Sequence, residues 1–156
     1  MKIASWNVNG IRARIDLVAA WIEENQPDVL ALQETKVVDE LFPYDVFESL
    51  SYSVEAFGQK SYNGVANITK SRSIQTTKGI TGLVDPQTRV ISTTHKDVRV
   101  VNVYVPNGQA VGSEKFDYKL NWLEHLKEML KDDLKKKTWK FVEDRNIEDR
   151  NAVNLA

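Results

Sequence analysis

The sequence predicts one α/β domain over residues 1–156, and three features support that prediction. Residues 2–33 follow the pattern of a strand, a helix and a second strand, joined by short links. Residues 29–32 are all apolar, which is typical of a strand that is buried on both faces. A chain of 156 residues with 42% apolar and 28% charged residues suits one globular domain better than two.

The first elements have recognisable boundaries. The alternating stretch 2–8 predicts a strand, and the Asn-Gly pair at residues 9–10 is typical of a turn. We expect Asp16 to cap a helix that ends near Asn25, where a proline two residues later stops it. The expected apolar face of this helix consists of Leu17, Val18, Trp21 and Ile22.

Polar residues mark the ends of both strands, because Asn7 closes the first and Glu34 follows the second. A strand–helix–strand unit forms a right-handed crossover with parallel strands, so we expect Asn7 and Glu34 near each other. That edge is where open α/β sheets bind ligands, and an amide with a carboxylate suits a hard divalent cation. The alternative is that Glu34 only marks where the strand leaves the core. One amide and one carboxylate also need further ligands.

The middle of the chain predicts two hairpins, formed by residues 52–57 with 65–69 and by residues 89–94 with 98–105. Residues 78–86 are expected to form a loop, and His95 is interpreted as a solvated residue of the second turn. Tyr104, one residue before a strand end, is either a core residue or part of a site. The segment 37–53 is expected to be a short helix or loop with these anchors: Leu41, Phe42, Phe47 and Leu50.

The last part predicts a long helix over residues 113–136, then a short strand over 138–142. The polar tail 148–156 is expected to be frayed. His125 lies off the expected apolar stripe of the helix, which consists of Phe116, Leu120, Leu123, Leu126, Leu130 and Leu134.

Composition narrows the classes of function. The absence of cysteine excludes disulfides, thiolate metal sites and cysteine nucleophiles, and it fits a reducing cytoplasm. Two histidines cannot form a multi-histidine zinc site, so oxygen ligands and Mg²⁺, Mn²⁺ or Ca²⁺ are expected. The sequence shows neither a membrane span nor a signal-peptide pattern. At a net charge of -1, DNA binding needs a local basic patch, and Lys60, Lys70 and Arg72 are either phosphate contacts or solvated surface charges.

Five segments, in order along the chain, resemble the motifs of the exodeoxyribonuclease III family of AP endonucleases, within the endonuclease/exonuclease/phosphatase superfamily. The resemblance extends from residue 1 to about residue 134, and its first two segments together are specific. The segments are Met1–Arg14, Leu30–Lys36, Gly58–Ala66, Arg89–Ile91 and Asn102–Gly108.

This resemblance implies a four-layered α/β sandwich of the DNase I-like type. It also implies a phosphodiesterase that depends on Mg²⁺ (or Mn²⁺) and acts on double-stranded DNA with abasic sites or blocked 3′ ends, in DNA repair. In the family's terms, Glu34 binds the metal, Asn7 supports that site, and Tyr104 lies by the scissile phosphate. Asp144 and Asn146 match a Gly-Asp-x-Asn motif, in which the aspartate acts on the attacking water and the asparagine holds the phosphate. The expected DNA contacts are Lys60, Tyr62, Asn63, Arg89 and Asn107.

Departures from the family predict an incomplete domain with impaired activity. Glu143 stands where the family has glycine, and Arg145 where it has an apolar residue. The family's second half, with a further aspartate and a Ser-Asp-His motif, has no counterpart in the sequence. We therefore expect most of the second sheet to be missing and one face of the first sheet to be bare. The alternative function is a non-catalytic fragment that binds DNA, a second copy or a partner chain through that face.

Overall fold

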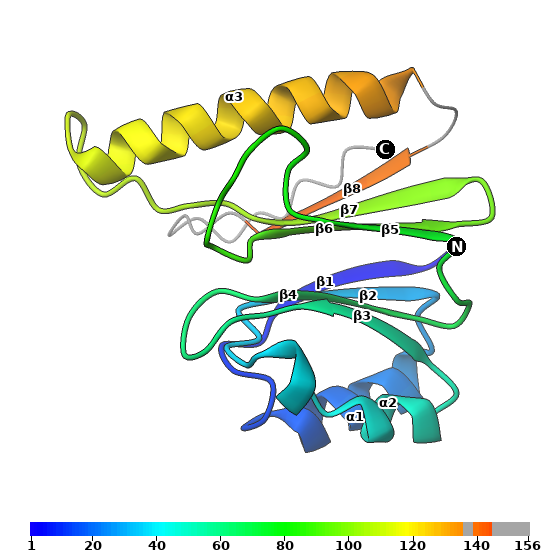
Figure 1. The fold of residues 1–156 in the computed structure, drawn as a ribbon. Coiled ribbons are helices and arrows are strands. Elements are labelled where there is room, and N and C mark those ends of the chain that lie inside the picture. Colours follow the sequence, from blue (N-terminus) through cyan, green and yellow to red (C-terminus); the bar gives the residue numbers. More distant parts are fainter. Residues whose placement is uncertain (136–138, 145–156) are drawn as a thin grey trace.

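The computed structural model describes residues 1–135 and 139–144, and for residues 139–144 it describes the backbone (Figure 1). Its helices and strands alternate in the manner of an α/β protein. They are β1 (Ile3–Asn7), α1 (Ile15–Asn25), β2 (Val29–Gln33), the 3₁₀ helix η1 (Asp39–Leu41), α2 (Tyr44–Ser49), β3 (Ser53–Phe57), β4 (Val65–Thr69), β5 (Gln75–Lys78), β6 (Val90–His95), β7 (Val98–Tyr104), α3 (Glu114–Leu134) and β8 (Trp139–Asp144).

Two four-stranded sheets stack face to face and are covered by helices on their outer sides (Figure 1). Sheet A has the order β1-β2-β4-β3 and carries α1 and α2 on its outer face, whereas sheet B has the order β5-β6-β7-β8 and carries α3. The four layers confirm the α/β sandwich that the sequence predicted. The second sheet has four strands, contrary to the expectation that most of it would be missing.

Sheet A confirms the predicted strand–helix–strand unit. β1 and β2 pair in parallel, and Asn7 stands opposite Gln33, so both strands end at the same edge. β3 and β4 form the predicted antiparallel hairpin, and β4 also pairs with β2. The apolar residues of α1, α2, β2 and β4 form one core cluster beneath the sheet, in which Val18, Ile22 and Phe47 are fully buried.

Sheet B contains a strand that sequence reasoning missed. β5 is Gln-Thr-Thr-Lys, which has no apolar residue to reveal it, and it pairs with β6 at the edge of the sheet. β6 and β7 form the predicted antiparallel hairpin, whereas β8 lies parallel to β7. A second core cluster, which includes Trp122, Leu126 and Met129 of α3, fills the space between α3 and the sheet.

The predicted bare face of sheet A is wrong, because sheet B covers it. Every residue of β2 and of β4 is buried. Ala31 clusters with Val100 of β7, and Val65 clusters with Ile91 of β6 and Tyr104 of β7. The inner face of sheet A therefore lies in the interior of the sandwich and is not a surface for a partner.

The interpretation of His95 as a solvated turn residue is also wrong. The turn consists of two residues, and Lys96 adopts a left-handed φ of 56°. His95 consequently remains the last residue of β6 and shares the inner face with Thr93, two residues earlier. Its side chain is buried, and His95 Nε2 lies 2.9 Å from Thr93 Oγ1.

Three details of the predicted helices differ from the structure. α1 begins after Arg14 without a side-chain cap, so Asp16 lies in the first turn, where its charge suits the helix dipole. The buried face of α3 is rotated from the predicted stripe and includes Asp133, which pairs with Arg99 (Nε to Oδ2, 2.7 Å). Four leucines that were expected to pack against the core are exposed instead, namely Leu17, Leu41, Leu120 and Leu134.

Within residues 1–135 and 139–144, the helices are all too short or too polar to cross a membrane.

Candidate functional site

Glu34 lies where three backbone segments meet at the carboxyl end of β2. Its φ is 53°, a left-handed conformation that is uncommon outside glycine, and its carbonyl oxygen accepts a hydrogen bond from Gly10 N (2.7 Å). The next two residues bind the loop before β4, with Thr35 N donating to Gly64 O (3.1 Å) and Lys36 N to the carbonyl oxygen of residue 63 (3.0 Å). The strained turn is thus held by its neighbours on both sides.

Glycine is required at position 64 for this arrangement. Gly64 has a φ of 92°, and a Cβ atom built there would lie 2.1 Å from Thr35 Oγ1. The threonine is buried, so its hydroxyl has little room to move away. Gly64, within the motif segment Gly58–Ala66, therefore supports the turn that carries Glu34.

The Glu34 carboxylate gathers donors from both sheets. Oε1 accepts hydrogen bonds from Asn7 Nδ2 (2.9 Å) and from the Tyr104 hydroxyl (2.8 Å), while Oε2 lies 3.0 Å from Lys36 Nζ. Asn7 belongs to sheet A and Tyr104 to sheet B, so this contact joins the two layers. The predicted proximity of Asn7 and Glu34 is confirmed.

These contacts keep the carboxylate ionised. Burial raises the pKa of Glu34, but the hydrogen bonds from Asn7, Lys36 and Tyr104 outweigh that effect and leave the pKa below its usual value. An ionised carboxylate with few water contacts is a strong attractor of cations.

The donor set offers part of a site for a hard cation. The Lys36 ammonium group already lies against Glu34 Oε2, which shows that this oxygen attracts positive charge. The amide nitrogen of Asn7 faces Glu34, while Asn7 Oδ1 accepts a hydrogen bond from Asn9 N (3.0 Å). In the part of the chain that the structure describes, no three His, Cys, Asp or Glu residues come together as a metal cluster.

Most of the expected DNA contacts line one cavity of about 430 Å³, and Arg89 in its wall connects it to Tyr104. The guanidinium of Arg89 stacks on the Tyr104 ring, 4.8 Å from its centroid, and Arg89 Nη1 donates to Tyr104 O (3.2 Å). Lys60 is exposed on the same loop but is not part of the cavity wall. The cavity is lined by Gln59, Tyr62, Asn63, Gln87, Arg89, Pro106, Asn107, Lys115 and Tyr118.

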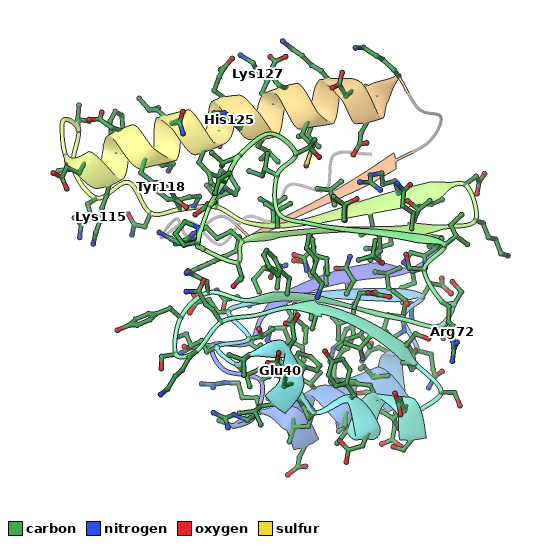
Figure 2. The ribbon with its side chains drawn as sticks, in the orientation of Figure 1. Glu40, Arg72, Lys115, Tyr118, His125 and Lys127 are labelled. Carbon is green, nitrogen blue, oxygen red and sulfur yellow. The ribbon has the colours of Figure 1, made fainter. Side chains whose placement is uncertain are left out.

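Two basic residues that could have contacted phosphate lie at the other end of the sheets. Lys70 follows β4 and donates through Nζ to Gln26 O (2.9 Å), next to the start of β2. Figure 2 shows Arg72 at this end, far from Lys115 and Tyr118. Both are surface charges remote from Glu34.

The last two candidate catalytic residues are placed only in part. Asp144 ends β8, and its backbone is in register with Tyr104 of β7. Asn146, like the tail 148–156, lies outside the described residues.

Sequence reasoning missed a network of buried amides that joins the sheets beneath Glu34. Asn102 of β7 accepts a hydrogen bond from Gln33 Nε2 (2.8 Å) and donates to Leu32 O (3.0 Å), Ala66 O (3.1 Å) and Asn67 Oδ1 (3.0 Å). The available signal was the presence of amide residues within otherwise apolar strands, where a buried polar group needs partners.

Comparison with known proteins places these features in a family context. The model of the Endonuclease/Exonuclease/phosphatase family matches residues 4–136. The exodeoxyribonuclease III of Haemophilus influenzae is 41% identical over 136 residues, which cover 83% of this chain and 51% of that protein. The DNA repair nuclease APEX1 of Danio rerio is 34% identical over 128 residues, which cover 78% of this chain and 41% of that protein. The chain thus spans about half the length of these relatives, or less.

Solved structures agree with the sequence matches. The 3′-5′ exonuclease NExo from Neisseria meningitidis is similar with a TM-score of 0.91 and 39% identity, over 94% of this chain and 58% of that one. An AP endonuclease from Archaeoglobus fulgidus is similar with a TM-score of 0.84 and 38% identity, over 90% and 56% of the respective chains.

Proposed function

The chain belongs to the endonuclease/exonuclease/phosphatase family, and we propose that it is a divalent-metal-dependent phosphodiesterase that acts on DNA. The observation that carries this proposal is the Glu34 carboxylate, held ionised between Asn7 of one sheet and Tyr104 of the other. A carboxylate of this kind, beside a cavity with Arg89 and Lys115 in its wall, suits the charge of a phosphodiester.

Glu34 is the proposed ligand of the metal, for which Mg²⁺ is the first choice and Mn²⁺ the second. A bound divalent cation would supply positive charge for the non-bridging phosphate oxygens. Asn7 orients the carboxylate through its amide nitrogen, and Tyr104 does so through its hydroxyl. The Lys36 ammonium group would share Glu34 Oε2 with the cation or move away from it.

Asp144 and Asn146 remain the proposed partners of the water and the phosphate. The register of β8 supports a role for Asp144, because its backbone lies opposite Tyr104. An aspartate at that position could take a proton from an attacking water molecule, and an asparagine two residues later could hold a phosphate oxygen.

The proposed substrate is double-stranded DNA with an abasic site or a blocked 3′ end. Relatives are named as a DNA repair nuclease and an AP endonuclease, and one solved neighbour is a 3′ phosphatase bound to a DNA hairpin. Lys60, Tyr62, Asn63, Arg89 and Asn107 are the proposed contacts to the DNA, and the proposed location is the cytoplasm.

A second candidate is a protein that binds DNA without cutting it. It is favoured by the lack of a cluster of three metal-ligating side chains within residues 1–135. In this case the cavity with Arg89 and Lys115 in its wall would bind the DNA, and Glu34 would take no part in cutting it.

The deciding experiment measures cleavage of a duplex that contains one abasic site, with Mg²⁺ and with EDTA. The unmodified chain is compared with an Asn7→Ala, Glu34→Ala double variant and with Glu24→Ala, which removes an exposed carboxylate from α1. Mg²⁺-dependent cutting that only the double variant loses supports the phosphodiesterase. Binding without cutting supports the second candidate, and folded protein that neither binds nor cuts refutes both.

A further inference from the structure

The cavity beside Tyr104 has two glutamines in its wall that were not among the expected DNA contacts. Gln59 lies on the loop between β3 and β4, and Gln87 lies in the segment before β6. Each is half-buried, and each has one end of its amide committed to the protein. The direction in which the other end points decides what the cavity can bind.

The side-chain amide oxygen of Gln59 accepts three hydrogen bonds. Oε1 accepts hydrogen bonds from Thr88 N (2.8 Å), Thr88 Oγ1 (3.1 Å) and Asn63 Nδ2 (3.0 Å). A backbone N–H can only donate, so the atom that faces Thr88 must be the oxygen. The nitrogen Nε2 is thereby turned away from these partners, and it makes no hydrogen bond to any described residue.

The orientation of the Gln87 side-chain amide follows from its partners in the same way. Its Oε1 accepts from Arg89 Nε (2.7 Å) and, more weakly, from Asn63 Nδ2 (3.5 Å). A guanidinium has only donors, so the facing atom is again the oxygen. Gln87 Nε2 likewise has no partner among the residues that the structure describes, which leaves two amide groups available to a ligand.

The charges around the cavity favour an anion. Arg89 and Lys115 are the cationic residues of its wall, and Figure 2 shows Lys115 near Tyr118 at the first turns of α3. The neighbouring carboxylate, Asp85, is occupied by the Tyr118 hydroxyl (2.7 Å) and by Gln87 N (2.9 Å). The amide of Asn63 has the opposite orientation, because its nitrogen Nδ2 donates to Gln59 Oε1 and Gln87 Oε1.

We propose that Gln59 and Gln87 form a phosphate subsite with Arg89 and Lys115. The subsite takes a phosphate of the DNA backbone that lies next to the one at Glu34, and this assignment of the ligand rests on the proposed function. Phosphate oxygens only accept hydrogen bonds, so amide nitrogens and cations complement them without competition. Arg89 links the subsite to Glu34, since it stacks on the Tyr104 ring whose hydroxyl binds Glu34.

The test measures binding of a fluorescent DNA duplex by anisotropy in EDTA, where metal-dependent cutting is excluded. Gln59→Glu and Gln87→Glu keep the oxygen that the inner donors need and replace the nitrogen with a charged oxygen. Gln75→Glu is the matched control, because it adds the same charge on exposed β5, in register with the other end of β6. We expect affinity to fall about ten-fold or more for each cavity variant and less than about three-fold for the control.

Equal losses in all three variants would overturn the subsite, because general repulsion would then explain them. Failure of the unmodified chain to bind the duplex would overturn it as well. A second measurement does not depend on how the variants fold: the side-chain amide signals of Gln59 and Gln87 in ¹⁵N NMR spectra should shift when the duplex is added to the unmodified protein. Unchanged signals at saturating DNA would refute the proposal.

These results are separable from the proposed catalytic function. DNA that binds through the glutamines but is not cut with Mg²⁺ would refute the phosphodiesterase and leave the subsite standing. Cutting that depends on Glu34 but is unaffected by both glutamine variants would support the phosphodiesterase and refute the subsite.

Discussion

Replacing Asn102 with leucine should weaken the attachment of the two sheets to each other. The Asn102 side chain is fully buried, accepts one hydrogen bond and has three acceptors for its nitrogen, and all four partners belong to β2 or β4. Leucine has a similar shape but no polar atom, so the variant removes these bonds without leaving a large cavity.

The expected loss is about 3 kcal/mol in the free energy of unfolding. Asn102 Nδ2 has two hydrogens for its three acceptors, so the side chain makes the equivalent of three full hydrogen bonds, and roughly 1 kcal/mol net for each gives about 3 kcal/mol. Asn67 Oδ1 also loses a donor in the interior, at a cost of about 1–3 kcal/mol, while the added apolar contacts of leucine offset a similar amount. Gln33 Nε2 keeps a hydrogen bond to Ser5 Oγ (3.0 Å), so it is not left without a partner.

Urea denaturation followed by tryptophan fluorescence measures this loss as a lower midpoint at an unchanged m-value. Asn121→Leu, on the exposed side of α3, is the control and should change stability by less than about 0.5 kcal/mol. A loss below about 1 kcal/mol for Asn102→Leu would show that the amide network does not hold the sheets together, and our account of the interface would be wrong.

Three further predictions concern the site and its supports. Tyr104→Phe removes a hydrogen bond that lowers the pKa of Glu34, so that pKa should rise in carboxyl ¹³C NMR titrations; an unchanged value contradicts the assigned contact. Burial lowers the pKa of His95 in the folded protein, whereas an unfolded histidine has a pKa of about 6.5. As the pH falls, the unfolded state therefore binds a proton before the folded state does, and the unmodified protein should lose more stability between pH 7 and 5 than His95→Asn. Gly64→Ala should cost about 3 kcal/mol, and Gly79→Ala, with positive φ but open space, only about 1–2 kcal/mol; equal losses would exclude a steric clash at Gly64.

Local pattern was a reliable guide where one element determined the outcome. The buried run before Glu34, the stop signals around α1 and the handedness of the crossover were enough to place Asn7 beside Glu34. The same reasoning failed for β5, whose polar residues carry no apolar signal, and for α3, whose buried face is set partly by the Arg99–Asp133 ion pair. A pair 34 residues apart in sequence leaves no trace in helical periodicity.

The error at His95 has a similar cause. Turn composition suggested a loop of three residues, but the left-handed conformation of Lys96 closes the hairpin with two. Because side chains alternate along a strand, a difference of one residue moved His95 from the solvent into the interior.

By itself, the sequence determined the first strand–helix–strand unit, the edge at which Asn7 and Glu34 lie, and the resemblance that led to the family. Tertiary structure alone decided that Tyr104 of sheet B donates to Glu34 of sheet A, that sheet B covers the face expected to be bare, and that the oxygen of Gln59 faces Thr88. The physical reason is that periodicity sets which face of its own element a residue occupies, whereas the stacking of separate sheets and loops decides what that face meets.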